Sequence, residues 1–186
     1  KKGEYLMKAT GIVRRIDELG RIVVPKEIRR TLRIREGDPL EIYTDSSGAV
    51  IFKKYSVIGE MSQFAYSYAD VLSKTLGFPV LISDRDHIIA VSGIPKREFA
   101  ERRISKFTED LMEDRENFSC YKEKSKKVYP VEGMENEAAL MYPIIAGGDV
   151  CGSVIVLKSD KPLPVENFAA SVAKISAEFL GRQIED

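Results

Sequence analysis

The sequence predicts an α+β protein with two domains, residues 1–55 and residues 56–186. The first observation is charge: residues 1–55 hold 13 Lys and Arg against 8 Asp and Glu, whereas the remaining residues hold 16 against 21. The resulting net charges of +5 and −5 cancel over the whole chain and suggest two domains with different partners. The second observation is periodicity, because short β-branched segments between glycine and proline turns alternate with segments of helical apolar spacing.

The composition excludes several classes of protein. Apolar residues make up 44% and charged residues 31% of the 186 residues, which is typical of a soluble globular protein. No apolar run approaches the roughly 18 residues of a membrane helix, and the first residues do not resemble a signal peptide, so we expect a cytoplasmic protein. The two cysteines and the single histidine, Cys120, Cys151 and His87, show no metal-ligand spacing, so neither a metal nor another cofactor is expected.

The first domain should consist of short strands and one helix. Its expected elements are strands at residues 10–16 and 21–24, a helix at 26–33, and a hairpin of strands at 40–44 and 49–55. Gly20 can take the positive φ that a turn between the first two strands needs. Pro25 suits the first position of the helix, where no N–H donor is required. Because a domain this small buries little surface, we expect it to dimerise through intertwined strands.

The second domain should begin and end with a long helix and contain antiparallel strands between them. Its expected elements are a helix at 57–76, strands at 78–83 and 88–92, two short helices within 95–115, weak strands at 118–121 and 127–131, a strong hairpin of 138–146 and 150–157, and a last helix from Pro162 or Pro164 to 184. Apolar residues repeat with 3-4-3-4 spacing in both end helices: Ile58, Met61, Ala65, Tyr68 and Leu72, then Val165, Phe168, Val172, Ile175 and Phe179. This spacing predicts core positions on two neighbouring helices, with a second role in a bundle between subunits.

A basic set of residues in the first domain points to nucleic acid. Its members are Lys8, Arg14, Arg15, Arg21, Lys26, Arg29, Arg30 and Arg33. On the predicted helix, Lys26, Arg29, Arg30 and Arg33 share one face, and the apolar residues Ile28 and Leu32 lie on the opposite face. Because the planar guanidinium of arginine suits phosphate groups and guanine edges, this pattern favours DNA binding over a merely solvated surface.

The first domain resembles the DNA-binding domain of the AbrB family of transition-state regulators. The resemblance covers residues 7–55, and its most specific part is Asp-Glu-Leu-Gly-Arg at 17–21, followed by Pro25 and Glu-Ile-Arg-Arg at 27–30. It implies a swapped-hairpin β-barrel dimer with a looped-hinge helix. It also implies DNA contacts by Lys8, Arg14, Arg15, Arg21, Arg29 and Arg30. Lys26 stands where some family members carry an apolar residue.

The second domain resembles a GAF domain, most clearly from Met141 to Leu157. The resemblance implies an antiparallel sheet with flanking helices and a role in sensing or in oligomerisation, most simply as a tetramer. It leaves open whether a small-molecule ligand binds beneath the helical segment at residues 94–131. The combination of the two domains resembles sporulation transcription regulators. It implies activation and repression of late genes through double-stranded DNA, with the protein located on the nucleoid of the forespore.

Two other functions remain open from the sequence. The first is an antitoxin, because antitoxins share the AbrB-type fold, although 131 patterned residues follow the first domain here. The second is a GAF enzyme such as a methionine sulfoxide reductase that would use Cys120 or Cys151. Neither cysteine has a neighbouring histidine, and Cys151 falls in a predicted strand, so we expect both to be structural and the protein not to be an enzyme.

Overall fold

The structure, a computed structural model, describes residues 10–161 and 166–185. It divides into two units, an N-terminal unit of Lys1–Lys54 and a C-terminal unit of Tyr55–Asp186. We describe each unit by itself. None of the helices within the described ranges is long and apolar enough to cross a membrane.

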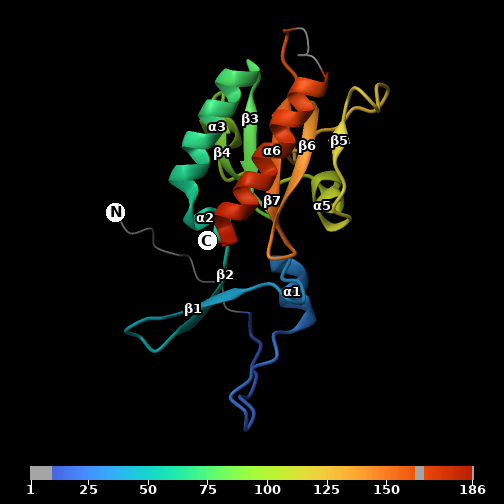
Figure 1. The fold of residues 1–186 in the computed structure, drawn as a ribbon. Helices are drawn as coiled ribbons and strands as arrows, with labels where there is room; N and C mark the ends of the chain where they lie inside the picture. The colour runs from blue at the N-terminus through green and yellow to red at the C-terminus, as the bar shows by residue number, and fades with distance from the viewer. Residues whose placement is uncertain (1–9, 162–165, 186) are drawn as a thin grey trace. The chain divides into compact units, whose positions relative to one another are not determined.

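Over residues 10–54, the N-terminal unit forms one helix and one hairpin (Figure 1). Helix α1 spans Lys26–Leu32, and strands β1 (Leu40–Thr44) and β2 (Val50–Lys54) pair in antiparallel register. The hairpin turn is organised by Asp45, whose Oδ1 accepts hydrogen bonds from the backbone N–H groups of Ser47 and Ala49, each at 2.9 Å. This local bonding is why an Asp-Ser-Ser-Gly sequence forms the turn.

The strands expected at residues 10–16 and 21–24 are absent from this chain. The turn between them is present: the N–H of Asp17 donates to the carbonyl of Arg21, and Gly20 has a φ of +75°. Among residues 10–54, the flanking segments have no neighbouring strand with which to form a ladder, and an isolated two-stranded ribbon is marginal in water. The prediction of strands was therefore wrong for a single copy of the chain.

The C-terminal unit is built on a five-stranded antiparallel sheet with the strand order β4-β3-β7-β6-β5. The strands are β3 (Val80–Ser83), β4 (Ile88–Ser92), β5 (Phe118–Ser119), β6 (Ala138–Ala146) and β7 (Asp149–Leu157). The central hairpin of β6 and β7 was predicted almost to the residue. The segment at residues 127–131 is not a strand: Pro130 has no N–H to donate, and only Val131 forms a bridge, to Ile104.

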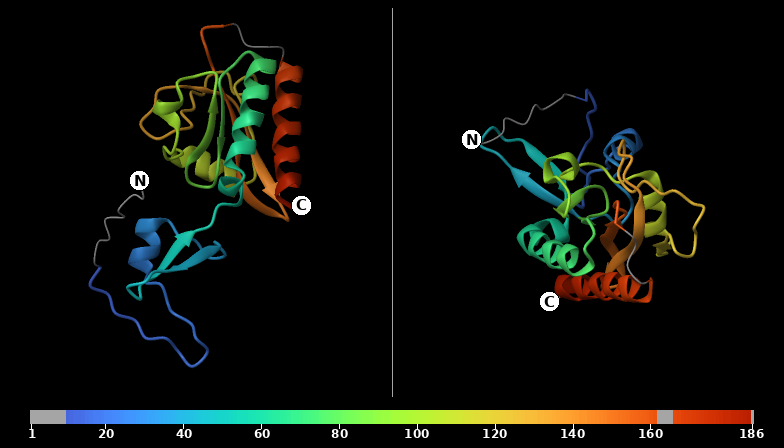
Figure 2. Two further views of the ribbon diagram at one scale, coloured as in Figure 1. Left: turned by 90° about the vertical axis from the view of Figure 1, so that its left-hand side faces the viewer. Right: turned by 90° about the horizontal axis from the view of Figure 1, so that it is seen from above.

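Helices α3 and α6 lie side by side on one face of the sheet, as the three views in Figures 1 and 2 agree. Helix α3 spans Ser62–Leu76 and follows a short helix α2 (Val57–Glu60), and α6 spans Glu166–Glu185. The short helices α4 (Lys96–Phe99) and α5 (Lys106–Glu113) lie towards the other face, so helices cover both faces of an antiparallel sheet. This arrangement confirms the predicted α+β class.

The two end helices meet through an aromatic cluster. The rings of Tyr68 and Phe179 are stacked with their centroids 5.4 Å apart, and Phe64 lies 5.9 Å from Tyr68 and 6.2 Å from Phe179. At these separations, aromatic rings attract one another beyond the effect of their buried area. The prediction that the end helices are neighbours is confirmed.

Helix α6 buries a different face from the one predicted. Phe168, Ile175 and Phe179 are 49%, 62% and 40% exposed. The residues that face the sheet are mostly small: Ala169, Ala173, Ser176, Ala177, Leu180 and Gly181. Small residues let a helix approach a sheet closely, and a Cβ on Gly181 would lie only 2.1 Å from the carbonyl oxygen of Ile145. Three residues of the predicted stripe, Phe168, Ile175 and Phe179, are therefore exposed, whereas Val172 packs partly against the core. Val165 lies outside the described residues.

Candidate nucleic-acid interface

Helix α1 presents two arginines of the predicted patch to solvent. Its first turn is fixed by Pro25, which is the only buried residue among residues 10–54 and whose carbonyl accepts the N–H of Arg29 at 2.9 Å. Arg29 and Arg30 are exposed, and no carboxylate pairs with either of them in the described part of the chain. Both guanidinium groups are therefore open to a phosphate, with which each can form a bidentate, charge-assisted contact.

The end of α1 is tied to the hairpin. Arg33 adopts a left-handed conformation with a φ of +52°, and the N–H of Ile34 bonds back to the carbonyl of Arg29 at 2.8 Å. Lys54, in β2, donates to the carbonyl of Arg33 at 2.9 Å, and its Nζ lies 3.5 Å from a carboxylate oxygen of Asp38. Sequence reasoning gave neither Lys54 nor Asp38 a role, although both help to hold α1 and its arginines in place.

Arg21 lies in the turn between residues 17 and 21, in close contact with Asp17. The carboxylate of Asp17 accepts the backbone N–H of Arg21 at 2.8 Å and, through its other oxygen, the guanidinium Nε at 2.8 Å. These two bonds, the backbone bond first, hold the pKa of Asp17 below its ordinary value. The side chain of Arg21 is 71% exposed and that of Asp17 is 43% exposed, so water screens the pair. A DNA phosphate can therefore compete with Asp17 for Arg21.

The other predicted contacts are less constrained. Arg14 and Arg15 are exposed on the segment before the turn, and the guanidinium of Arg14 donates to the carbonyl of Val13 at 3.2 Å. Lys8 lies outside the described residues. Within residues 10–54 no hydrogen bond or ion pair joins Arg14, Arg15 or Arg21 to the arginines of α1. One chain therefore holds two separate sets of exposed arginines, one on the turn and one on α1.

The N-terminal unit exposes many large apolar side chains. Val13, Leu19 and Val23 are 84%, 74% and 73% exposed, and Leu32, which was expected to lie on the covered side of α1, is 53% exposed. The prediction that Leu32 is buried was therefore wrong for one chain. Single exposed apolar residues are ordinary, but such a density of them in a small unit indicates an interaction surface.

The two cysteines lack the features of reactive thiols. Cys120 is buried and Cys151 is half-buried, and both are free. Desolvation by burial is the largest influence on each and raises the pKa of both thiols above the ordinary value. A raised pKa reduces the fraction of thiolate, which is the nucleophilic form, at neutral pH. The structure therefore gives a sulfoxide reductase reaction no activated nucleophile at either cysteine.

The space beneath residues 94–131, where a GAF-type ligand was considered, is occupied by the protein's own side chains. Phe99, Ile104, Met112 and Phe118 are at most 3% exposed and belong to the main hydrophobic core. The ring of Phe107 also packs edge-on against Phe118 at 6.0 Å. This segment therefore acts first as a cover for the sheet.

Comparisons with known proteins match both units. The family model described as "Stage V sporulation protein T C-terminal, transcription factor" matches residues 60–185. A second model, "Antidote-toxin recognition MazE, bacterial antitoxin", matches residues 13–58. Stage V sporulation protein T of Bacillus subtilis (strain 168) is 50% identical over 182 residues, which cover 96% of this chain and 99% of that protein. The transition state regulatory protein AbrB of the same organism is 56% identical over 62 residues, covering 30% of this chain and 64% of that protein.

Among solved structures, the N-terminal DNA recognition domain of Bacillus subtilis AbrB is 62% identical, with a TM-score of 0.23, and covers 27% of this chain and 92% of that one. A GAF domain from an Acinetobacter phosphoenolpyruvate-protein phosphotransferase is 12% identical, with a TM-score of 0.47, over 69% of this chain and 90% of that one. The assignment rests on the sequence matches, which span both units. On these matches, the chain belongs to the stage V sporulation protein T family of transcription factors.

Proposed function

We propose that this protein is a regulator of sporulation genes that binds double-stranded DNA through its N-terminal unit and both activates and represses transcription. Arg14, Arg21, Arg29 and Arg30 would make the principal contacts, with Lys8 and Arg15 adding positive charge. The observation that carries the proposal is that Arg29 and Arg30 stand exposed and unpaired by carboxylates, within the described residues, on a helix fixed at both ends. Phosphate contacts would supply most of the affinity, with DNA shape adding preference.

The exposed apolar residues of the N-terminal unit support a dimer. A second copy would offer the segments at residues 10–16 and 21–24 the strand partners that they lack among the described residues of one chain, and would cover Val13 and Val23. Dimerisation would also double the number of arginines on one surface. The two sets of arginines from each of two chains would form one extended positive surface, which could follow a DNA groove.

DNA binding is tested by fluorescence anisotropy of the full chain with one A·T-rich and one G·C-rich duplex across a salt series. We expect a steep salt dependence and a preference for the A·T-rich duplex. The double variant Arg29→Ala/Arg30→Ala should bind at least tenfold more weakly, with a shallower salt slope. The control Lys122→Ala/Lys124→Ala removes the same charge from exposed positions of the C-terminal unit and should bind like wild type. Equal binding by the two double variants would refute the role of α1.

We also propose that the C-terminal units associate through the outer face of α3 and α6 and so join two DNA-binding dimers into a tetramer. Val71 on α3 is 59% exposed, and it lies on the same pair of helices as the exposed Phe168, Ile175 and Phe179 of α6. Two large apolar faces of this kind pack in the manner of a helix bundle. Tethering would raise the effective concentration of the second DNA-binding dimer.

Assembly is tested by sedimentation of the full chain. Ile175→Asp places a charge in the centre of the apolar face and should reduce the tetramer to dimers. Asn167→Asp adds the same charge at an exposed polar position in the first turn of α6 and should leave the tetramer intact. A wild-type chain that sediments as a dimer, or equal effects of the two variants, would refute this interface.

The antitoxin alternative has one observation in its favour, the match of residues 13–58 to an antitoxin family model. That match is confined to the part of the chain that the proposal already assigns to DNA. The remaining residues match a transcription factor family and form a folded sheet and helices rather than a short tail. Regulation of transcription accounts for both units, and we therefore prefer it.

A further inference from the structure

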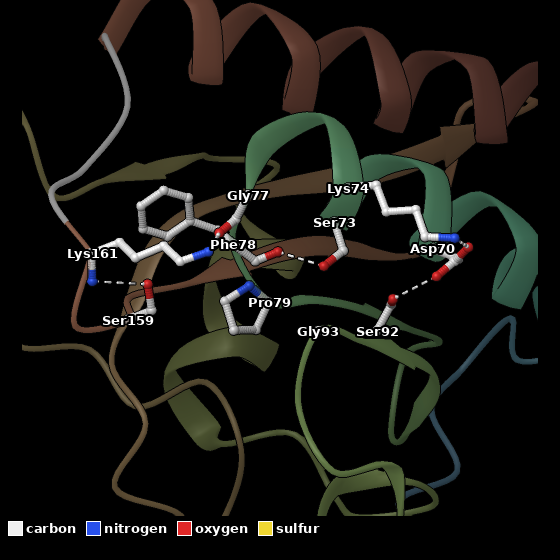
Figure 3. A pocket seen from close by; sticks show the side chains of 10 residues that line it. All are labelled: Asp70, Ser73, Lys74, Gly77, Phe78, Pro79, Ser92, Gly93, Ser159 and Lys161. Atoms are coloured by element: carbon white, nitrogen blue, oxygen red, sulfur yellow. Dashed lines mark hydrogen bonds and ion pairs between the residues drawn. The ribbon is translucent and has the colours of Figure 1, made fainter.

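The polar groups that line a pocket of the C-terminal unit bond mainly to one another (Figure 3). Asp70 accepts a hydrogen bond from Lys74 at 2.6 Å and another from Ser92 at 3.3 Å. Ser73 donates to the carbonyl of Phe78 at 2.7 Å. These bonds tie α3 to β4 and to the loop after α3, so we assign them a structural role.

A buried carboxylate and a lysine meet at the end of α1, in the N-terminal unit. The side chain of Asp38 is 2% exposed, and its Oδ2 accepts the backbone N–H of Arg35 at 2.8 Å and lies 3.5 Å from Nζ of Lys54. Lys54 also donates to the carbonyl of Arg33 at 2.9 Å. Building on the proposed binding of DNA by α1, we propose that Lys54, held in place by Asp38, is a positioning residue: it fixes the C-terminal end of α1 and thereby the two arginines of α1 that contact DNA.

The hairpin brings Lys54 beside the loop that carries Asp38. In the register of β1 and β2, Lys54 pairs with Leu40, two residues after Asp38. The loop is closed on itself, because the N–H of Asp38 bonds to the carbonyl of Arg35 at 3.3 Å while the carboxylate of Asp38 accepts the N–H of Arg35. Lys54 therefore joins the end of α1 and this loop to β2, the strand from which the chain leaves the N-terminal unit.

The bonds that close the C-terminal end of α1 end on Arg29 and Arg30 themselves. The N–H of Ile34 donates to the carbonyl of Arg29 at 2.8 Å, and the N–H of Arg33 donates to the carbonyl of Arg30 at 3.3 Å. Arg33 has a φ of +52°, a left-handed conformation that is unfavourable for a residue with a Cβ. Because Lys54 binds the carbonyl of Arg33, its ammonium stabilises the turn on which both closing bonds depend. Loss of Lys54 would therefore loosen the backbone of Arg29 and Arg30.

The burial of Lys54 favours positioning over direct contact with DNA. Its side chain is 26% exposed, whereas that of Arg21 is 71% exposed. The ammonium of Lys54 already serves a carbonyl and a buried carboxylate, and taking a cation from beside a buried carboxylate is costly. We therefore expect loss of Lys54 to act through the arginines of α1, and not through loss of a phosphate contact.

The experiment is fluorescence anisotropy of the full chain with an A·T-rich duplex across a salt series. Lys54→Met should weaken binding by about tenfold, the order expected for one lost charged hydrogen bond. Its salt slope should stay that of wild type, because the arginines contact the same phosphates once they are ordered in the complex. The control Lys53→Met removes the same charge from the adjacent exposed position of β2 and should bind with close to wild-type affinity. Lys54→Arg, which keeps a positively charged donor, should retain most of the affinity.

Asp38→Asn gives a test of opposite sign. It makes the N-terminal unit more positive by one charge, so charge alone would tighten the binding of DNA. Release of Lys54 from its carboxylate would instead weaken the binding, and we expect the weaker binding.

A variant that combines Lys54→Met with Arg29→Ala/Arg30→Ala tests the route of the effect. If Lys54 acts through these arginines, Lys54→Met should cause little further loss of affinity in the variant that lacks them. A variant that had unfolded would instead lose the remaining affinity in this background as well.

Three results would overturn the positioning role of Lys54. They are equal effects of Lys54→Met and Lys53→Met, a salt slope that falls by about one in Lys54→Met, and an undiminished loss when Lys54→Met is added to the double arginine variant. Tighter binding by Asp38→Asn would overturn the support that we assign to Asp38. Failure of the proposed function is distinct from all of these, since wild type would then not bind the duplex, or Arg29→Ala/Arg30→Ala would bind it normally.

Discussion

Substitution of Gly181 by alanine tests how closely α6 packs against the sheet. An added Cβ would lie 2.1 Å from the carbonyl oxygen and 3.1 Å from the carbonyl carbon of Ile145, whereas real Cβ contacts are essentially never under 3.0 Å. The helix or strand β6 must therefore move by about 0.9 Å. Because the obstacle is backbone rather than the end of a flexible side chain, no rotamer change relieves it.

The expected change in the free energy of unfolding is the balance between the cost of the steric clash and the gain in helix propensity. Overpacking of a buried contact costs about 1–3 kcal/mol, and a backbone obstacle places this site near the upper value. If the helix moves away from the sheet, neighbours such as Ala177 are separated from their contacts. A gap of 0.5–1 Å removes about a quarter to a half of the dispersion energy of each such contact. Alanine in a helix interior is more favourable than glycine by about 1 kcal/mol. The net expectation is a loss of about 2 kcal/mol of unfolding free energy.

Thermal unfolding at fixed protein concentration is the assay, because assembly shifts the apparent stability. For a chain of this size the expected loss lowers the Tm of the C-terminal transition by about 4–8 °C. Ser171→Ala is the control, since it adds helix propensity at an exposed position of α6 and should change the unfolding free energy by less than about 0.5 kcal/mol. A Gly181→Ala protein as stable as wild type would refute the close approach of α6 and β6.

Two further predictions concern titratable groups. The folded-state pKa values of Asp17 and Asp45 are lowered, so the stability they contribute is fully present above their unfolded pKa of about 3.9 and is lost as the pH falls through the lower folded value. Urea unfolding from pH 6 to pH 3 should therefore depend less on pH in Asp17→Asn/Asp45→Asn than in wild type, and identical profiles would contradict this reasoning. Burial raises the pKa of Cys120 and Cys151, so alkylation by iodoacetamide at pH 7 should be slower than for a free thiol and should accelerate only well above pH 8.5. Cys120→Ser/Cys151→Ser should keep wild-type DNA binding, and loss of binding would give the thiols a role that the structure does not.

Local signals were sufficient for most elements of the C-terminal unit. Gly77 ends α3 with a φ of +74°, as a glycine after a periodic apolar segment predicts. The glycine pair at 147 and 148 marks the turn of the β6–β7 hairpin, where both residues have positive φ. In each case the side chain, or its absence, selects the backbone conformation without help from distant residues. Elements of this kind are readable from sequence.

The orientation of α6 was not readable from the size of its apolar residues. Large residues at 3-4-3-4 spacing predict a buried stripe, but Phe168 and Ile175 are exposed while Ala169 and Ala173 face the sheet. The competing signal was present in the spacing of Ala169, Ala173 and Ala177 by one turn. Periodicity locates two apolar faces on such a helix. It does not determine which face packs against the sheet and which remains exposed.

The arginines of the N-terminal unit illustrate a second limit. The sequence places Arg29 and Arg30 on one exposed face of a helix, and the structure agrees. The sequence does not show that Asp17 holds Arg21, or that Lys54 fixes the end of α1 from another strand, since the second contact joins residues 21 positions apart. The contact that fixes the end of α1 is tertiary, so the sequence identifies the charges and not their geometry.

Both units expose apolar side chains that their own cores do not cover, and this shared feature connects their proposed roles. In the described part of the N-terminal unit, the segments at residues 10–16 and 21–24 have no partner strand, and Val13 and Val23 are exposed to solvent. In the C-terminal unit, the core is complete, yet Ile175 and Phe179 remain outside it. Apolar surface that one chain cannot cover is buried most readily against an identical surface of another copy. The proposed tetramer would bury both surfaces: each chain would contact one copy through its N-terminal unit and another copy through its C-terminal unit.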